Sequence, residues 1–408
     1  MSGANSTLVR AATAVTLFLW SCGMAAAGDN LNVIIISFDL LRTDRLAAYG
    51  CDKNLAPNID AFSGKSVVFL NAISPASWTL PAAMSVFTGL YPKQHKMTVP
   101  NRKYGQDADQ CHDQCDDMWV KVSLKPGLMT LPEVFKNLGY ETAAFTGGMS
   151  FGGQYGFNRG FDSYEESSGT IKDSLHHAKA LLDTRSGRRP LFLLIQGFDL
   201  IHLLPEQKRV MVYDEKISAA DPAFGDFFAF LEKKGLLKNA VIAFLSHHGD
   251  GFGSHVLGDG NPAHAASHGT ALYEELIRVP LIIYRPGTRP RTIESQVSLL
   301  DLSPTLIAAA GLKEDEKFAA QSRGIALYPF AGKKNKCRNV FSETDFRFIY
   351  QKSAIRTCSG WKLIYDSQTS ARELYNLKTD PEEKENLFEK EPEIAGRLEN
   401  ELFDWLIE

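Results

Sequence analysis

Thr79 is the first residue whose type and position suggest chemistry, because it lies just before Pro81 and an expected helix over residues 81–88. The start of a helix offers unpaired N–H groups and a partial positive charge, which stabilise an anionic oxygen. A threonine hydroxyl can attack a bound ester there once a metal stabilises its alkoxide. The structural alternative is an ordinary N-cap threonine, and the two roles are compatible.

Three expected strands end beside side chains that bind metals. Asp39 follows the apolar run 33–38, Asp199 follows the run 191–195, and His247 and His248 follow the run 241–245. Open α/β sheets bind ligands beyond the carboxyl ends of their strands, so we expect these side chains to converge. Carboxylates and imidazoles are ligands of divalent cations. The alternatives are an N-cap role for Asp39 and solvated loop positions for the histidines.

Strand-like runs alternate with helical patterns, which predicts an α/β fold whose sheet is covered by helices on both faces. The clearest strands are residues 33–38, 142–146, 191–195, 241–245 and 281–284, and the helical patterns are residues 57–63, 81–88, 131–138, 214–234 and 304–310. After Gly311 the sequence changes to a charged stretch, to shorter strand-like runs at 339–342, 354–357 and 361–365, and to a terminal helix over 392–406.

Several short motifs, in this order, resemble the sulfatase family of the alkaline-phosphatase superfamily. They are the run 77–89, Gly-Leu-Tyr-Pro at 89–92, Val-Pro-Leu-Ile at 279–282, Asp-Leu-Ser-Pro-Thr-Leu at 301–306 and Glu-Leu-Tyr-Asn-Leu at 373–377. Each motif is weak alone, but their order and spacing together are specific. The resemblance implies a large mixed sheet sandwiched by helices over residues 28–312, followed by a small C-terminal α+β subdomain over residues 313–408.

The resemblance places Thr79 at the nucleophile position, where sulfatases carry a cysteine or serine that becomes formylglycine. Threonine cannot yield that aldehyde, and Ala83 stands where the family usually has arginine, so formylglycine is not expected. Asp39, Thr79 and His248 match metal-ligand positions, and His247 replaces an aspartate. Because imidazole brings no negative charge, this set favours zinc or manganese, with calcium as the alternative.

The resemblance also implies a second metal site of Asp199, His202 and His268, as in two-zinc members of the superfamily. His202 comes one residue later than in the usual Asp-x-His segment, and His268 stands near the position of a lysine in sulfatases. We expect His268 to take part in catalysis as well. His255 and Lys103 are candidates for binding substrate oxygens, and the alternative for both is a solvated surface.

These residues together predict an exported hydrolase of sulfate- or phosphate-type esters, with Thr79 as nucleophile and one or two divalent metals. The substrate would be a small molecule or a glycan that carries such an ester. Two alternatives stay open. One is a degenerate member that binds sulfated or phosphorylated glycans without cleaving them, and the other is a phosphoryl transferase of the cell envelope.

The composition of the 408 residues, 44% hydrophobic and 23% charged, is that of a globular protein, and the formal charge of -4 argues against a nucleic-acid partner. Residues 1–27 resemble a secretory signal peptide, with Arg10, an apolar run at 11–20 and alanines at 25–27. This predicts a periplasmic or secreted protein, and the alternative is a lipid anchor on Cys22. Neither this run nor any later one is apolar for long enough to span a membrane.

Export would permit disulfides. Two local pairs are plausible, Cys111–Cys115 and Cys337–Cys358, which would leave Cys51 free. Sequence alone does not fix this connectivity, and a metal site is the alternative for residues 111–115.

Overall fold

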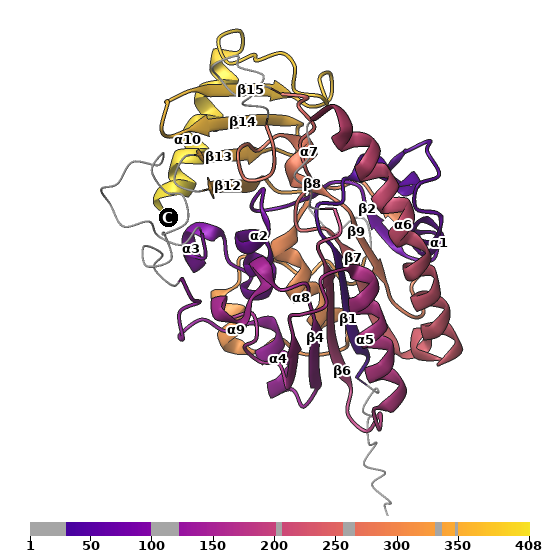
Figure 1. The fold of residues 1–408 in the computed structure, drawn as a ribbon. Helices are drawn as coiled ribbons and strands as arrows, with labels where there is room; N and C mark the ends of the chain where they lie inside the picture. Colours follow the sequence, from indigo (N-terminus) through magenta and orange to yellow (C-terminus); the bar gives the residue numbers. More distant parts are fainter. Residues whose placement is uncertain (1–29, 99–121, 201–205, 256–265, 331–336, 347–349) are drawn as a thin grey trace, which may run out of the picture.

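The computed structural model describes residues 30–98, 122–200, 206–255, 266–330, 337–346 and 350–408. Its centre is an eight-stranded mixed sheet (Figure 1). β1 pairs in parallel with β6 and with β7, while β9 is antiparallel to both β7 and β2. From edge to edge the strands are β10 (Arg291–Ile293), β2 (Val67–Phe69), β9 (Leu281–Tyr284), β7 (Ala240–Leu245), β1 (Asn32–Phe38), β6 (Leu191–Gly197), β4 (Glu141–Phe145) and β5 (Ser163–Glu165).

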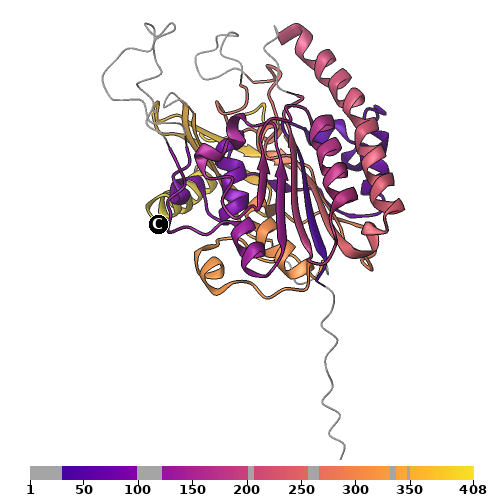
Figure 2. The same cartoon turned by 60° about the horizontal axis from the view of Figure 1, so that its bottom comes forward.

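Strand β1 is buried on both faces because helices cover both sides of the sheet, as Figure 2 shows. Val33 and Ile35 belong to one hydrophobic core, whereas Ile34, Ile36 and Phe38 belong to the other. This alternation follows from the two-residue period of a strand. The first core includes residues of α2 (Thr79–Thr88), α4 (Leu131–Asn137) and α8 (Leu302–Ala309), and the second includes residues of α1 (Pro57–Ser63), α5 (Ile171–Thr184) and α6 (Glu206–Lys233).

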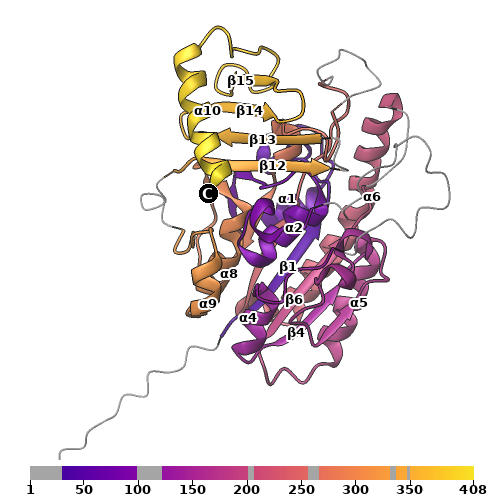
Figure 3. The ribbon, with the colours of Figure 1, turned by 90° about the vertical axis from the view of Figure 1, so that its left-hand side faces the viewer.

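The C-terminal part forms an antiparallel sheet of four strands, which carries helix α10 (Pro392–Ile407) on one face (Figure 3). Leu363 and Leu374 of the sheet pack with Leu398, Leu402 and Trp405 of the helix. The sheet lies close to the segment before α2, because Ala76 and Glu343 form a parallel bridge. Its strands are β12 (Val340–Phe346), β13 (Tyr350–Arg356), β14 (Trp361–Asp366) and β15 (Arg372–Asn376).

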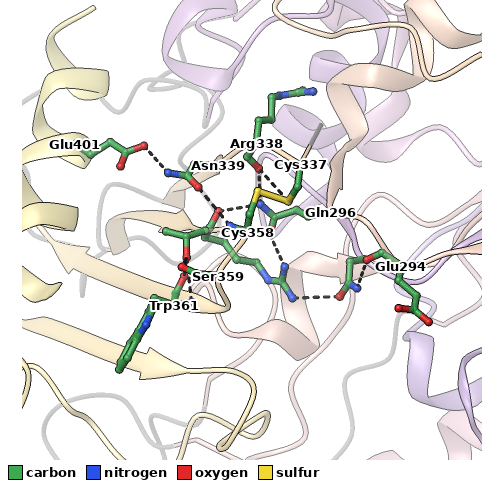
Figure 4. Close-up of a disulfide and its surroundings, with 12 residues drawn as sticks. Glu294, Gln296, Cys337, Arg338, Asn339, Cys358, Ser359, Trp361 and Glu401 are labelled. Atoms are coloured by element: carbon green, nitrogen blue, oxygen red, sulfur yellow. Dashed lines mark hydrogen bonds between the residues drawn. A yellow bond between two sulfur atoms is a disulfide. The ribbon is translucent and has the colours of Figure 1, made fainter. Parts of the chain in front are cut away.

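Smaller elements connect these two parts. A three-stranded sheet has the order β11 (Val297–Ser298), β3 (Ala72–Ile73) and β8 (Arg278–Val279), and three short helices are α3 (Pro92–His95), α7 (Glu274–Ile277) and α9 (Glu316–Gln321). Cys337 and Cys358 form a disulfide beside the turn between β13 and β14 (Figure 4). Cys51 is a free cysteine, as expected, whereas Cys111 and Cys115 lie outside the described residues.

The predicted fold class is confirmed, with a mixed sheet between helices and a small C-terminal antiparallel sheet. Helix α5, with 14 residues, is not among the predicted helices, and two predicted helices begin earlier than expected. Helix α6 begins at Glu206 instead of residue 214, and α2 begins at Thr79 instead of Pro81. Residues 206–213 have little apolar periodicity, but most are good helix formers, so intrinsic propensity extends the helix there. Within the described ranges, no helix is long and apolar enough to cross a membrane.

Candidate active site

Helix α2 presents Thr79 to the carboxyl end of β1. Trp78 is the N-cap residue in an extended conformation, and Thr79 is the first helical residue, in the turn that contains Pro81. A proline in the first turn loses no intrahelical hydrogen bond, so it fixes the start of the helix without cost. All ten residues of α2 are buried, and Gly89 ends the helix in a left-handed conformation. The core therefore holds Thr79 firmly in place.

The Thr79 hydroxyl lies between a carboxylate and an imidazole. Its Oγ1 donates to Oδ2 of Asp39 at 2.6 Å and lies 3.0 Å from Nε2 of His248. The Nδ1 atom of His248 lies 2.7 Å from the carbonyl oxygen of Gly249, to which it donates. In the neutral ring the proton is thus on Nδ1, and the lone pair of Nε2 faces Thr79. This is the arrangement of a nucleophile beside an oriented base.

His247 lies on the other side of Asp39. Its Nδ1 atom is 2.9 Å from the Ser37 hydroxyl and 3.6 Å from Oδ1 of Asp39. The ring also contacts the aromatic ring of Phe151, with 5.3 Å between centroids. Ser37 and Asp39 are two residues apart at the end of β1, so they continue the face of the sheet that α2 covers.

The pKa values of Asp39 and His248 agree with this geometry. Burial raises the pKa of Asp39, but the nearby rings of His248 and His247, when charged, and the hydrogen bond from Thr79 outweigh it and hold that pKa below its ordinary value. Burial lowers the pKa of His248 by more than Asp39 raises it. The carboxylate is therefore ionised and the imidazole neutral near pH 7.

A second pair of a histidine and an aspartate, His268 and Asp250, lies beside His248 and Asp39. Nδ1 of His268 is 3.0 Å from Oδ1 of Asp250, and the rings of His268 and His248 are 5.6 Å apart. Burial raises the pKa of Asp250, but the hydrogen bond and charge of His268 outweigh it and lower that pKa. Arg42 Nη1 donates to the main-chain oxygen of Asp250 at 2.9 Å and so fixes the loop that carries it.

The other predicted site residues are placed elsewhere. Oδ2 of Asp199 accepts from the backbone N–H of Ile171 at 2.7 Å, so this carboxylate meets the first turn of α5. His255 stacks on Tyr273 at 3.8 Å in a separate cavity. His202 and Lys103 lie outside the described residues. The structure therefore brings together Asp39, Thr79, His247 and His248, with His268 beside them, but not Asp199 or His255.

Asp39, His247 and His248 are of types that bind divalent metals, so their arrangement decides whether they form a metal site. The buried Oδ1 atom of Asp39 accepts no hydrogen bond from any described residue, which would suit a cation. However, no group of three or more His, Cys, Asp or Glu side chains in the described ranges is arranged so that it could hold a metal ion. As placed, these donors do not fit a metal, and no chemical step is derived through one.

Ser37 and Asp250 are the site residues that sequence reasoning missed. The sequence contains a signal for each of these two residues. Ser37 lies two residues before Asp39 on the same strand and therefore faces the same side. Asp250 follows His248 by two residues in the same loop. Its partner His268 lies too far along the chain for spacing to reveal the pair.

Comparison with known proteins shows which class this fold and site define. The Sulfatase family model matches residues 31–180 and 160–312, and the model "N-sulphoglucosamine sulphohydrolase, C-terminal" matches residues 267–406. The protein is thus an ester hydrolase of the alkaline-phosphatase superfamily. Within that superfamily the chain belongs to the sulfatase family, whose enzymes are sulfuric ester hydrolases and generally use a divalent metal.

Individual relatives agree with this assignment. The Delta 4,5-hexuronate-2-O-sulfatase of Bacteroides thetaiotaomicron is 23% identical over 454 aligned positions, which cover 92% of this chain and 88% of that protein. The structure of a 2-O GAG sulfatase has a TM-score of 0.75 at 19% identity and covers 93% of this chain and 92% of that chain. The phosphonate monoester hydrolase of Agrobacterium radiobacter has a TM-score of 0.69 at 18% identity, covering 92% and 95%.

Proposed function

We propose that this protein hydrolyses sulfate- or phosphate-type monoesters or diesters of small molecules or glycans, with Thr79 as the nucleophile. The observation that carries the proposal is the position of the Thr79 hydroxyl, 2.6 Å from Asp39 Oδ2 and 3.0 Å from His248 Nε2 at the start of α2. The hydroxyl carries one proton and has an acceptor on each side, so the proton that it donates to Asp39 in the resting site can turn to Nε2 of His248.

In the first step a new bond forms between Thr79 Oγ1 and the sulfur or phosphorus of the substrate, and the bond to the ester oxygen breaks. The Thr79 proton moves to Nε2 of His248, and the carboxylate of Asp39 stabilises the charged imidazole. The first N–H groups of α2 face the charge that develops on the transferred group. His268, held by Asp250 at 3.0 Å, gives a proton to the departing oxygen.

In the second step water attacks the same sulfur or phosphorus atom and the bond to Thr79 Oγ1 breaks. His248 returns its proton to the threonine oxygen, and the proton lost by water restores His268. The sum is one ester and one water converted to one alcohol and one inorganic acid anion. Thr79 is regenerated without formylglycine, consistent with a threonine at position 79 and an alanine at position 83.

Zinc or manganese remains a prediction for the metal of this enzyme, and calcium is the alternative. A periplasmic or secreted location, after cleavage of residues 1–27, also remains a prediction, since that segment lies outside the described residues. N-terminal sequencing of the protein from its producing cell would check the cleavage site.

The test is a screen of sulfate and phosphate monoesters and diesters, with and without added divalent metal, on wild type, Thr79→Ala and Thr88→Ala. Thr88 is the matched control, because its buried hydroxyl in the same helix donates to the carbonyl oxygen of Met84, away from the site. We expect Thr79→Ala to lose about 1000-fold or more in kcat/KM and Thr88→Ala to keep most activity. Full activity in Thr79→Ala would refute the mechanism.

Two substitutions favour a second candidate, a protein that binds such esters without cleaving them. Ala83 and His247 replace residues of the sulfatase site. Tight binding of a sulfated or phosphorylated glycan to wild type, with no turnover under any metal and no covalent adduct on Thr79 by mass spectrometry, would establish binding as the function.

A further inference from the structure

His268 lies in a short turn that three different parts of the chain hold in place. Thr270 closes the turn, because its Oγ1 atom accepts from the N–H of Ser267 and donates to the carbonyl oxygen of the same residue, both at 2.9 Å. Asp250, in the loop after β7, accepts from the main-chain N–H of His268 at 3.2 Å and lies 3.0 Å from its Nδ1. The side chain of His268 is 38% exposed, so a substrate can reach it.

The other two contacts hold the residue that follows His268. The N–H of Gly269 donates at 2.8 Å to the carbonyl oxygen of Ser77, which lies just before α2. The hydroxyl of Thr344, on β12, donates to the carbonyl oxygen of Gly269 at 2.6 Å. Gly269 and Thr344 are both buried, so water does not readily replace this hydroxyl. The turn is therefore fixed to the start of α2 on one side and to the C-terminal sheet on the other.

β12, the edge strand of the C-terminal sheet (Figure 3), also packs against the turn. Gly269 has a φ of +82°, which glycine adopts without strain, and a Cβ atom added there would come within 2.6 Å of the ring of Phe346. The same ring lies 5.4 Å from the ring of Trp78 and 6.4 Å from the ring of His268, between centroids. β12 thus forms one wall of the region around His268.

We propose that Thr344 is a positioning residue for His268, so that the C-terminal sheet completes the active site. This role rests on the proposed function, in which His268 protonates the departing oxygen. Because Nδ1 of His268 faces Asp250, the proton for that oxygen comes from Nε2, whose position depends on where the turn places the ring. A misplacement of about 1 Å can cost about 100-fold in rate. A hydroxyl that fixes the main chain next to His268 thus controls the acid without touching the substrate.

The leaving group of the substrate distinguishes a positioning role from a merely structural one. 4-Nitrophenolate departs readily without a proton, whereas phenolate does not, so a general acid matters more for phenyl esters. The substrates are the phenyl and 4-nitrophenyl sulfates or phosphates, whichever series wild type cleaves. We expect Thr344→Val to lower kcat/KM at least tenfold more for the phenyl ester than for the 4-nitrophenyl ester. Thr344→Ser keeps the hydroxyl and should restore both values.

Ser342→Ala is the matched control. Ser342 is also buried on β12, and its hydroxyl also donates to a carbonyl oxygen at 2.6 Å, but that oxygen belongs to Ser74, away from the turn. We expect this variant to keep the wild-type kcat/KM for both esters. Equal losses for the two esters in Thr344→Val, or the same pattern in Ser342→Ala, would overturn the proposal.

Hydrogen exchange of the full chain tests the positioning without turnover. In Thr344→Val the backbone N–H groups of residues 267–270 should exchange at least tenfold faster than in wild type, with no change there in Thr344→Ser or Ser342→Ala. Unchanged exchange in Thr344→Val would also overturn the proposal. Failure of the proposed function is a different result, in which wild type cleaves no ester or Thr79→Ala keeps full activity. The exchange measurement then decides the role of Thr344 alone.

Discussion

Replacing Lys362 by methionine should strongly destabilise the protein. Lys362 lies on β14 and is 0% exposed, with Nζ 2.8 Å from Glu383 Oε1 and 3.2 Å from Glu274 Oε1. Glu274 also binds Arg356 at 3.0 Å, so two cations balance two carboxylates. The cluster joins the C-terminal sheet to α7, which follows the loop of the candidate active site.

The size of the effect follows from this balance. Lys362→Met leaves one buried negative charge uncompensated, and breaking a buried ion pair in this way costs about 3–5 kcal/mol. The double variant with Glu383→Gln restores neutrality and should recover part of the loss, since contacting charges couple by about 0.5–3 kcal/mol. Lys378→Met, at an exposed lysine of the same region, is the control and should cost under about 0.5 kcal/mol.

The pH dependence of the free energy of unfolding tests the same cluster. Burial raises the pKa of Glu383 above its ordinary value of 4.5, against the opposing charge of Lys362. Without Lys362 that pKa rises further, so the folded variant binds more protons than the unfolded chain above pH 4.5. Stability must then fall as pH rises, and the penalty of Lys362→Met should be larger at pH 8 than at pH 5.

Urea unfolding at the two pH values measures all three variants. A cost below about 1 kcal/mol for Lys362→Met at pH 8, or no recovery in the double variant, would contradict the view that this cluster holds paired charges away from water.

Three further predictions concern other parts of the chain. Replacing Cys337 and Cys358 by serine opens a loop with a sequence separation of 21 and should lower the free energy of unfolding by about 3 kcal/mol in an oxidising buffer, with no difference from wild type under reduction. Burial lowers the pKa of His95 from 6.5 to about 3, so between these pH values the unfolded chain binds a proton that the folded chain does not. The free energy of unfolding is therefore highest above pH 6.5 and should be about 2 kcal/mol lower at pH 5. Urea unfolding should show a smaller decrease in His95→Gln. The steps proposed above need no metal whereas the family generally uses one, and chelation distinguishes the two: loss of ester hydrolysis that zinc or manganese restores would contradict the metal-free steps, and full activity with no metal detected by elemental analysis would exclude the cofactor.

The convergence of Asp39 and His248 follows from sequence because both side chains follow strand ends, whereas Thr79 is placed at the site by the family resemblance. β1 and β7 are apolar runs long enough to be central parallel strands, and their carboxyl ends meet at one edge of the sheet. The alternation of side chains along β1 determines which of them face the core that contains α2. These are local patterns that a single sequence contains.

The direction of a side chain after a strand end is not contained in such patterns. Asp199 follows β6 as Asp39 follows β1, yet its carboxylate accepts from the N–H of Ile171, because a helix start nearby has unpaired donors. His255 and Glu275 form a pair that depends on the packing of α7 against a distant loop. Spacing along the chain cannot distinguish these tertiary partners from ligands of one site.

The substitutions at positions 79, 83 and 247 are consistent with one another when their surroundings are considered together. Ala83 is 0% exposed in the core beneath α2, so the arginine usual in sulfatases would not fit without rearrangement. His247 in place of an aspartate leaves Asp39 as the one carboxylate that hydrogen-bonds Thr79 among the described residues. In the proposed mechanism a neutral His248 accepts the proton of Thr79, and the smaller negative charge at the site favours that neutral form.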